Sequence, residues 1–215
     1  MLELPPRLAA RVAYFAAAAN LAAAAMMALV LKAGVPVPDS RLGERIAFVH
    51  EHRTLWLTGW FSWHVASVSL VLLVLVLASR FRPRAPLRAT LAAVLAVVGL
   101  AADLAAEAIA MGVAPATDLP PGGFFLIESL VGALTGYLAN GLYTVAGILL
   151  MWAGARELPR AVVALGAAVW AAGLWLSAAT LAHSAAGQFW STAVLMPLFV
   201  LWAVLVGRWL SPQKS

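Results

Sequence analysis

Two carboxylates lie inside the otherwise apolar stretch GLAADLAAEAIAMG, residues 99–112: Asp103 and Glu107. They are four residues apart, so a helix places them on one face. An ionised side chain at the centre of a membrane helix costs about 2.5–3.5 kcal/mol on insertion scales, and such residues usually face the interior of a bundle. Two bare carboxylates this close repel each other, and a shared proton, a cation or a metal relieves the repulsion. The pair is therefore the first candidate for chemistry.

Three further titratable residues are predicted in the outer half of the membrane. Glu128 and His183 lie near the outer ends of their helices, and His64 lies about 13 Å below the outer surface, a little short of the midplane. With the two acids they would form a cup of carboxylates and imidazoles, a ligand set that suits zinc, iron or manganese. In this hypothesis His64, Asp103, Glu107 and His183 bind the metal ion, and Glu128 is a catalytic base or a further ligand. The alternative is structural: a hydrogen-bonded acid pair, a packed His64, and interfacial Glu128 and His183.

A second polar group lies in the segment 124–153, where Tyr137 and Asn140 follow the small-xxx-small pair Gly132 and Gly136. A locally opened helix would let Tyr137 and Asn140 line a substrate cavity. Close helix packing with interhelical hydrogen bonds is the alternative.

The composition indicates whether these residues lie in a soluble domain or in a membrane protein. Hydrophobic residues make up 64% of the 215-residue chain and charged residues 11%, whereas soluble domains are about 45–50% apolar. The chain therefore reads as an integral membrane protein. The absence of cysteine excludes disulfides, thiolate nucleophiles and iron–sulfur ligation.

Hydropathy predicts an all-α fold, a single membrane-embedded helical domain over residues 1–215 with six transmembrane helices. A short amphipathic helix is also expected at the outer membrane surface, near 40–54. The predicted spans are 11–32, 55–79, 88–112, 124–153, 160–182 and 189–209.

Basic residues predict the orientation. Ten of the fourteen Lys and Arg residues fall on one side of the predicted spans, and the positive-inside rule makes that side cytoplasmic. Both termini are then cytoplasmic, and we expect the protein in the cell inner membrane. The ten residues are Arg7, Arg11, Arg80, Arg82, Arg84, Arg88, Arg156, Arg160, Arg208 and Lys214.

Four functions stay open at this stage. The first is a metal-dependent enzyme that acts on a lipid or small amphiphile entering from the outer leaflet. The second is a proton-coupled transporter or relay that uses the Asp103–Glu107 pair. The third is electron transfer through a haem with His64 and His183 as axial ligands. The fourth is a non-catalytic subunit of a membrane complex.

The motifs and charge distribution restrict the partners. The net charge of +5 comes from residues at span ends rather than from a basic patch with interleaved aromatic residues, so nucleic acid is not expected as a partner. Membrane lipids are expected partners, and a homo-oligomer or larger membrane complex stays open. No HExxH, GxSxG or P-loop motif is present, and the layout is similar to that of many small bacterial membrane proteins.

Overall fold

The computed structural model describes residues 5–38, 40–115 and 119–212, and every regular element in these ranges is helical. Six helices are long and apolar enough to cross a membrane, as the sequence predicts. The elements are α1 (Pro6–Leu29), η1 (Leu31–Ala33), α2 (Leu42–Glu51), α3 (Arg53–Phe81), α4 (Pro86–Gly112), α5 (Pro121–Gly132), η2 (Ala133–Ala139), α6 (Asn140–Gly154), α7 (Arg160–Leu181) and α8 (Ala185–Leu210).

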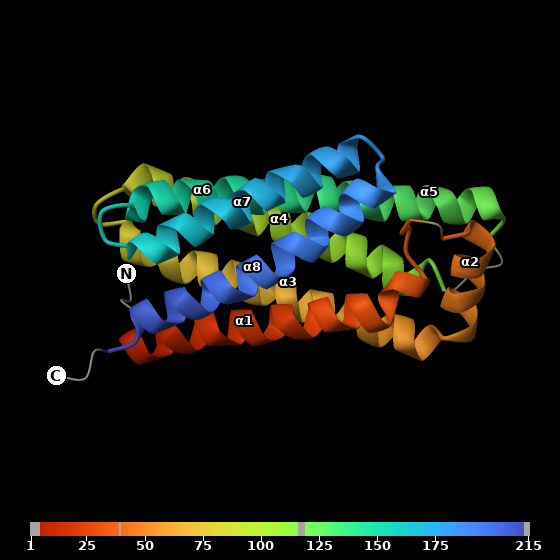
Figure 1. The fold of residues 1–215 in the computed structure, drawn as a ribbon, viewed down its shortest axis with the longest axis horizontal. Coiled ribbons are helices and arrows are strands. Elements are labelled where there is room, and N and C mark those ends of the chain that lie inside the picture. Colours follow the sequence, from red (N-terminus) through yellow and green to blue (C-terminus); the bar gives the residue numbers. More distant parts are fainter. Residues whose placement is uncertain (1–4, 39, 116–118, 213–215) are drawn as a thin grey trace.

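The long helices form a ring in which neighbours in sequence are neighbours in space. α1 packs against α3, α3 against α4, α4 against α6, α6 against α7, and α7 against α8. α8 packs in turn against α1, which closes the ring. The start of α1, the end of α8 and the α3–α4 and α6–α7 connections lie at one end of the elongated bundle, and α2 and the start of α5 lie at the other (Figure 1).

The helix starts follow from local sequence. Pro6, Pro86 and Pro121 stand in the first turn of α1, α4 and α5, where the missing N–H costs nothing and the fixed φ favours the helix. Ser184 caps α8, and its hydroxyl accepts a hydrogen bond from the backbone N–H of Gly187 at 3.1 Å. These signals fix where each helix enters the bundle.

Small residues bring the helices close together. Ala16, Ala92, Ala96 and Ala146 are fully buried in the core shared by α1, α3, α4, α6, α7 and α8. At Gly147 the ring of a tryptophan from α7 occupies the space that a Cβ would need. Small side chains of this kind let membrane helices pack at short range, so the alanine-rich sequence is the basis of the ring.

The fourth apolar helix changes its hydrogen-bonding pattern midway. α5, η2 and α6 run continuously over Pro121–Gly154, and η2 is a π-helix. At its end the N–H of Asn140 reaches back to the carbonyl of Thr135, five residues earlier. A π-helical turn widens the backbone locally and is frequent at functional sites. This turn faces α4 and α7.

Between α1 and α3 the chain forms α2, which packs against α5 and α3. Its buried residues are Arg45 and Val49. The sequence predicts a helix at the membrane surface in this region; that location stays a prediction. In the structure, α2 lies beside α5 and covers one end of the ring (Figure 1).

Candidate functional site: a buried acid pair and a central cavity

Asp103, on α4, is held by two hydroxyl groups of the fourth apolar helix. Its side chain is only 6% exposed. The hydroxyl of Thr135, in the π-helical turn, donates to Oδ1 in a short contact, and the hydroxyl of Tyr143, on α6, donates to Oδ2 at 3.3 Å. Within the described ranges no basic side chain forms an ion pair with Asp103. The acid is thus solvated by hydroxyls and has no counter-ion there.

Glu107, one turn further along α4, faces α3 instead. Ser67 donates to Oε1 at 3.2 Å, and Nδ1 of His64 lies 2.8 Å from Oε2. The His64–Glu107 contact lacks regular hydrogen-bond geometry, so both atoms keep hydrogen-bonding capacity. Glu107 is fully buried, whereas the His64 side chain is 36% exposed and stacks on the exposed ring of Phe61. His64 therefore links the buried carboxylate to the outside of the bundle.

A cavity of about 540 Å³ occupies the centre of the ring. It extends from the segment Gly34–Val37, before α2, to Tyr143 and Trp170 deep in the bundle. Its walls are mostly apolar and aromatic, but Asp103 and Asn140 also line it. His64 and Glu107 are absent from the lining. The two acids are one turn apart but have different surroundings: Asp103 lines the cavity, whereas Glu107 lies in the contact between α3 and α4.

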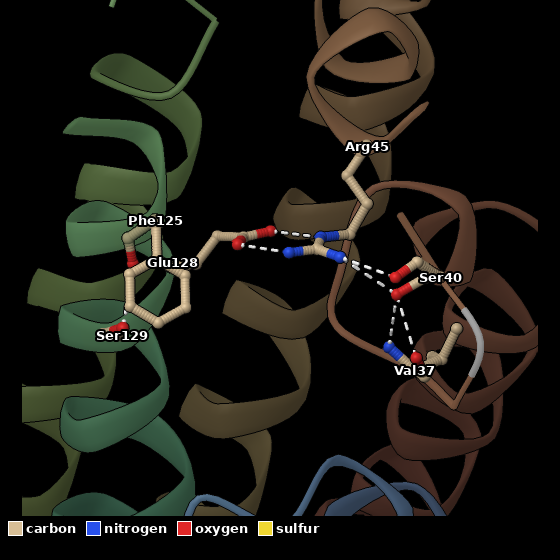
Figure 2. Close-up of polar contacts among 6 residues, drawn as sticks. All are labelled: Val37, Ser40, Arg45, Phe125, Glu128 and Ser129. Atoms are coloured by element: carbon tan, nitrogen blue, oxygen red, sulfur yellow. Dashed lines mark hydrogen bonds and ion pairs between the residues drawn. The ribbon is translucent and has the colours of Figure 1, made fainter. Parts of the chain in front are cut away.

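Glu128, on α5, is engaged by Arg45 of α2 (Figure 2). Nε and Nη2 of Arg45 donate to the two carboxylate oxygens at 2.7 and 2.8 Å, and both side chains are more than 90% buried. Nη1 of Arg45 also donates to the carbonyl and hydroxyl of Ser40, whose hydroxyl donates to the carbonyl of Val37. This bidentate pair, through Ser40, ties the cavity-lining segment Gly34–Val37 to α5. We call Arg45, Glu128 and Ser40 the loop clasp.

The structure thus brings some of the predicted metal ligands together and separates others. His64 meets Glu107, and Asp103 lies one turn away. Glu128 belongs to the loop clasp, and His183 lies in the exposed α7–α8 turn with a positive φ of 50°. Among the described residues no group of three or more His, Cys, Asp or Glu side chains is placed to hold a metal ion.

The two residues predicted to line a substrate path differ in position. Asn140 lines the cavity and joins α6 to α7, donating to the carbonyl of Gly173 at 2.7 Å and to the hydroxyl of Ser177 at 2.8 Å. Tyr137 is 45% exposed and is not among the residues that line the cavity. Asn140 therefore both shapes the cavity and holds the π-helical turn against α7.

Sequence reasoning assigned no site role to Arg45, Thr135 or Tyr143. No local signal links Thr135 or Tyr143 to Asp103, because they lie 32 and 40 positions away in the sequence. Arg45 lies in the segment 40–54, for which the sequence predicts only a short amphipathic helix. Its neighbours, Glu44 on one side and the apolar run IAFV on the other, carry no signal that its side chain is buried.

Gly99 controls the position of Tyr143. A Cβ added at Gly99 would lie 2.9 Å from the Tyr143 ring and 3.2 Å from the carbonyl oxygen of Ala139. We expect Gly99→Ala to displace this ring and its hydroxyl from Asp103 and to lower the free energy of unfolding by about 1–3 kcal/mol, as overpacking does. Equilibrium unfolding in detergent measures this.

The matched control for this prediction is Gly112→Ala. Gly112 is the last residue of α4, and a Cβ there meets no atom within 4 Å. Equal stability of the two alanine variants would show that the Gly99–Tyr143 contact is not tight.

Comparison with known proteins adds no relative: no family model, no curated protein and no solved structure matches this chain.

Proposed function

We propose that the protein is a proton-coupled transporter of small amphiphilic molecules. The observation that carries this proposal is the central cavity lined by buried Asp103, one helical turn from a second buried acid, Glu107, which contacts the partly exposed His64. Chains of Asp, Glu and His inside a membrane are the usual components of proton relays in pumps and transporters.

Each residue has a distinct role in this proposal. His64, whose side chain is 36% exposed, exchanges protons with the outside. Glu107 receives the proton from the imidazole, because Oε2 lies 2.8 Å from Nδ1. Asp103 holds the polar end of the ligand in the cavity, and the charge state of Glu107 on the next turn changes the electrostatic free energy of that carboxylate. Ligand binding and proton binding are thereby coupled.

The geometry favours transport over the metal-dependent enzyme and the haem protein predicted from sequence. A catalytic metal generally needs three protein ligands, and in the described part of the chain only His64 and Glu107 are in direct contact among the predicted set. A haem bound by two histidines needs both imidazoles to face one iron atom. His64 instead packs on Glu107 and Phe61, and His183 occupies an exposed turn.

The proposal includes an orientation. The start of α1, the end of α8 and the α3–α4 and α6–α7 connections share one end of the bundle (Figure 1). These segments contain most of the arginines of the sequence, so we assign that end to the cytoplasm by the positive-inside rule. The end of the cavity lined by Gly34–Val37 then lies toward the outside, in the inner membrane of a bacterium.

Proteoliposomes with a trapped pH-sensitive dye test the proposal. An inward proton gradient is imposed in the presence of one of three probes: ethidium, a cation; anilinonaphthalene sulfonate, an anion; or benzyl alcohol, which is neutral. We expect at least one probe to raise proton flux above that of protein-free liposomes, and Asp103→Asn to remove the increase. Flux equal to that of protein-free liposomes with all three probes would overturn the proposal.

A further inference from the structure

We infer that the ligand of the central cavity is a hydrophobic cation, a molecule with an apolar body and one positive charge that pairs with Asp103. This inference rests on the proposed transport function and names its substrate class. It depends on three features of the cavity: the charges of its lining, the aromatic character of its walls and its volume.

The charges of the lining leave one acid without a basic partner. Asp103 and Glu128 are the acids among the residues that line the cavity. Glu128 already forms a bidentate ion pair with Arg45, whereas Asp103 receives only the hydroxyls of Thr135 and Tyr143. Lys32, also in the lining, is exposed and lies in η1, directly before the segment Gly34–Val37. A carboxylate buried without a cation is costly, and a cationic ligand would remove that cost.

Aromatic rings supply the second feature. Trp56, Trp60, Trp63, Trp170 and Phe124 line the cavity, and Trp56 and Trp60 form an edge-to-face pair with ring centroids 5.7 Å apart. The faces of indole rings attract cations, most strongly when the cation is desolvated. The walls therefore suit both the apolar body and the positive charge of one ligand.

The volume sets the size of that ligand. About 540 Å³ lies within the range of about 300–1,000 Å³ that is typical of pockets for drug-sized molecules. A metal ion or a simple ammonium ion would leave most of this apolar space unfilled. A molecule with several aromatic rings or a branched alkyl body fits it better.

Binding of two isosteric ions tests this inference. Tetraphenylphosphonium and tetraphenylborate have nearly the same size and shape but opposite charge. Titration of the full chain in a neutral detergent, followed by calorimetry and by tryptophan fluorescence, gives both dissociation constants. We expect Asp103→Asn to weaken tetraphenylphosphonium binding at least about tenfold, because a charge-assisted contact is lost, and to leave tetraphenylborate binding unweakened.

Two further variants complete the test. Glu157→Gln removes an acid from the α6–α7 connection, where it pairs with Arg84, and serves as the matched control that keeps wild-type affinity. Ala24→Phe fills the cavity from α1, because Ala24 is part of its lining, and should weaken both ions without a change in charge. Should Asp103→Asn fail to fold, tighter binding of tetraphenylphosphonium than of tetraphenylborate by the wild type, together with weaker binding of both ions by Ala24→Phe, supports the cation assignment, and equal wild-type binding of the two ions overturns it.

The outcomes separate this inference from the transport proposal. Absent tetraphenylphosphonium binding, or equal binding by the wild type and Asp103→Asn, overturns the cation assignment even if proton flux occurs with another probe. Binding that depends on Asp103 supports the cation assignment even if no proton flux is found, because the titration in detergent involves no membrane gradient.

Discussion

Proton flux in proteoliposomes should fall to the level of protein-free liposomes when Glu107 is replaced by glutamine. Glutamine keeps the shape of the side chain and can still accept the hydroxyl of Ser67, which lies 3.2 Å from Oε1 in the wild type. It cannot take up or release a proton at the position 2.8 Å from His64. A relay is interrupted when any of its members loses the ability to titrate, so we expect a complete loss of flux rather than a partial one.

The control for this variant is Glu157→Gln, which makes the same change of side chain. Glu157 lies in the α6–α7 connection, at the end of the bundle away from α2 (Figure 1), and pairs there with Arg84. The control variant should retain the flux of the wild type. Near-wild-type flux in Glu107→Gln, measured with protein that elutes as the wild type does in size-exclusion chromatography, would exclude Glu107 from the proton route.

The loop clasp should give the largest change in stability. Arg45→Ala leaves the carboxylate of Glu128 buried without its guanidinium partner, and breaking a buried ion pair from one side costs about 3–5 kcal/mol. We expect the free energy of unfolding in detergent to fall by about that amount. The segment Gly34–Val37 should also become more accessible to protease, because Arg45 no longer holds Ser40 and Val37 near α5.

Two matched variants distinguish an unpaired charge from a loss of packing. The double variant Arg45→Ala with Glu128→Gln removes both charges and should recover part of the stability lost in the single variant. Arg41→Ala breaks only an exposed 3.9 Å contact with Glu44 and should change stability by less than about 1 kcal/mol. A double variant as unstable as Arg45→Ala would show that the buried charge of Glu128 is not the cause.

The long helices and the main acid pair could be predicted from the sequence for physical reasons. A helix that crosses a membrane needs about 20 apolar residues, so hydropathy alone identifies six candidates, all of which are helical in the structure. The spacing of Asp103 and Glu107 predicts one face of one helix, and both side chains are buried there. Both features could be predicted from local sequence because each depends on the residues of a single helix.

Contacts between helices could not be predicted in the same way. Hydropathy gives the depth of a residue but not the rotation of its helix, so the sequence placed His64, Glu128 and His183 in the outer half of the membrane without showing which of them meet. His64 contacts Glu107, whereas Glu128 turns to Arg45 across 83 positions of sequence. The π-helical turn at Ala133–Ala139, which brings Thr135 to Asp103, depends on a shift of backbone hydrogen bonds that has no composition signal.

Infrared spectroscopy of the carboxyl groups tests most directly whether Glu107 exchanges a proton inside the bundle. The difference between spectra of the wild type and of Glu107→Gln assigns the C=O stretching band of the protonated Glu107 side chain. We expect the intensity of this band to rise and fall reversibly as the external pH is cycled, and the band to respond when tetraphenylphosphonium fills the cavity. A band of constant intensity, or no assignable band at all, over the whole pH range in which the protein stays folded would contradict proton exchange at Glu107.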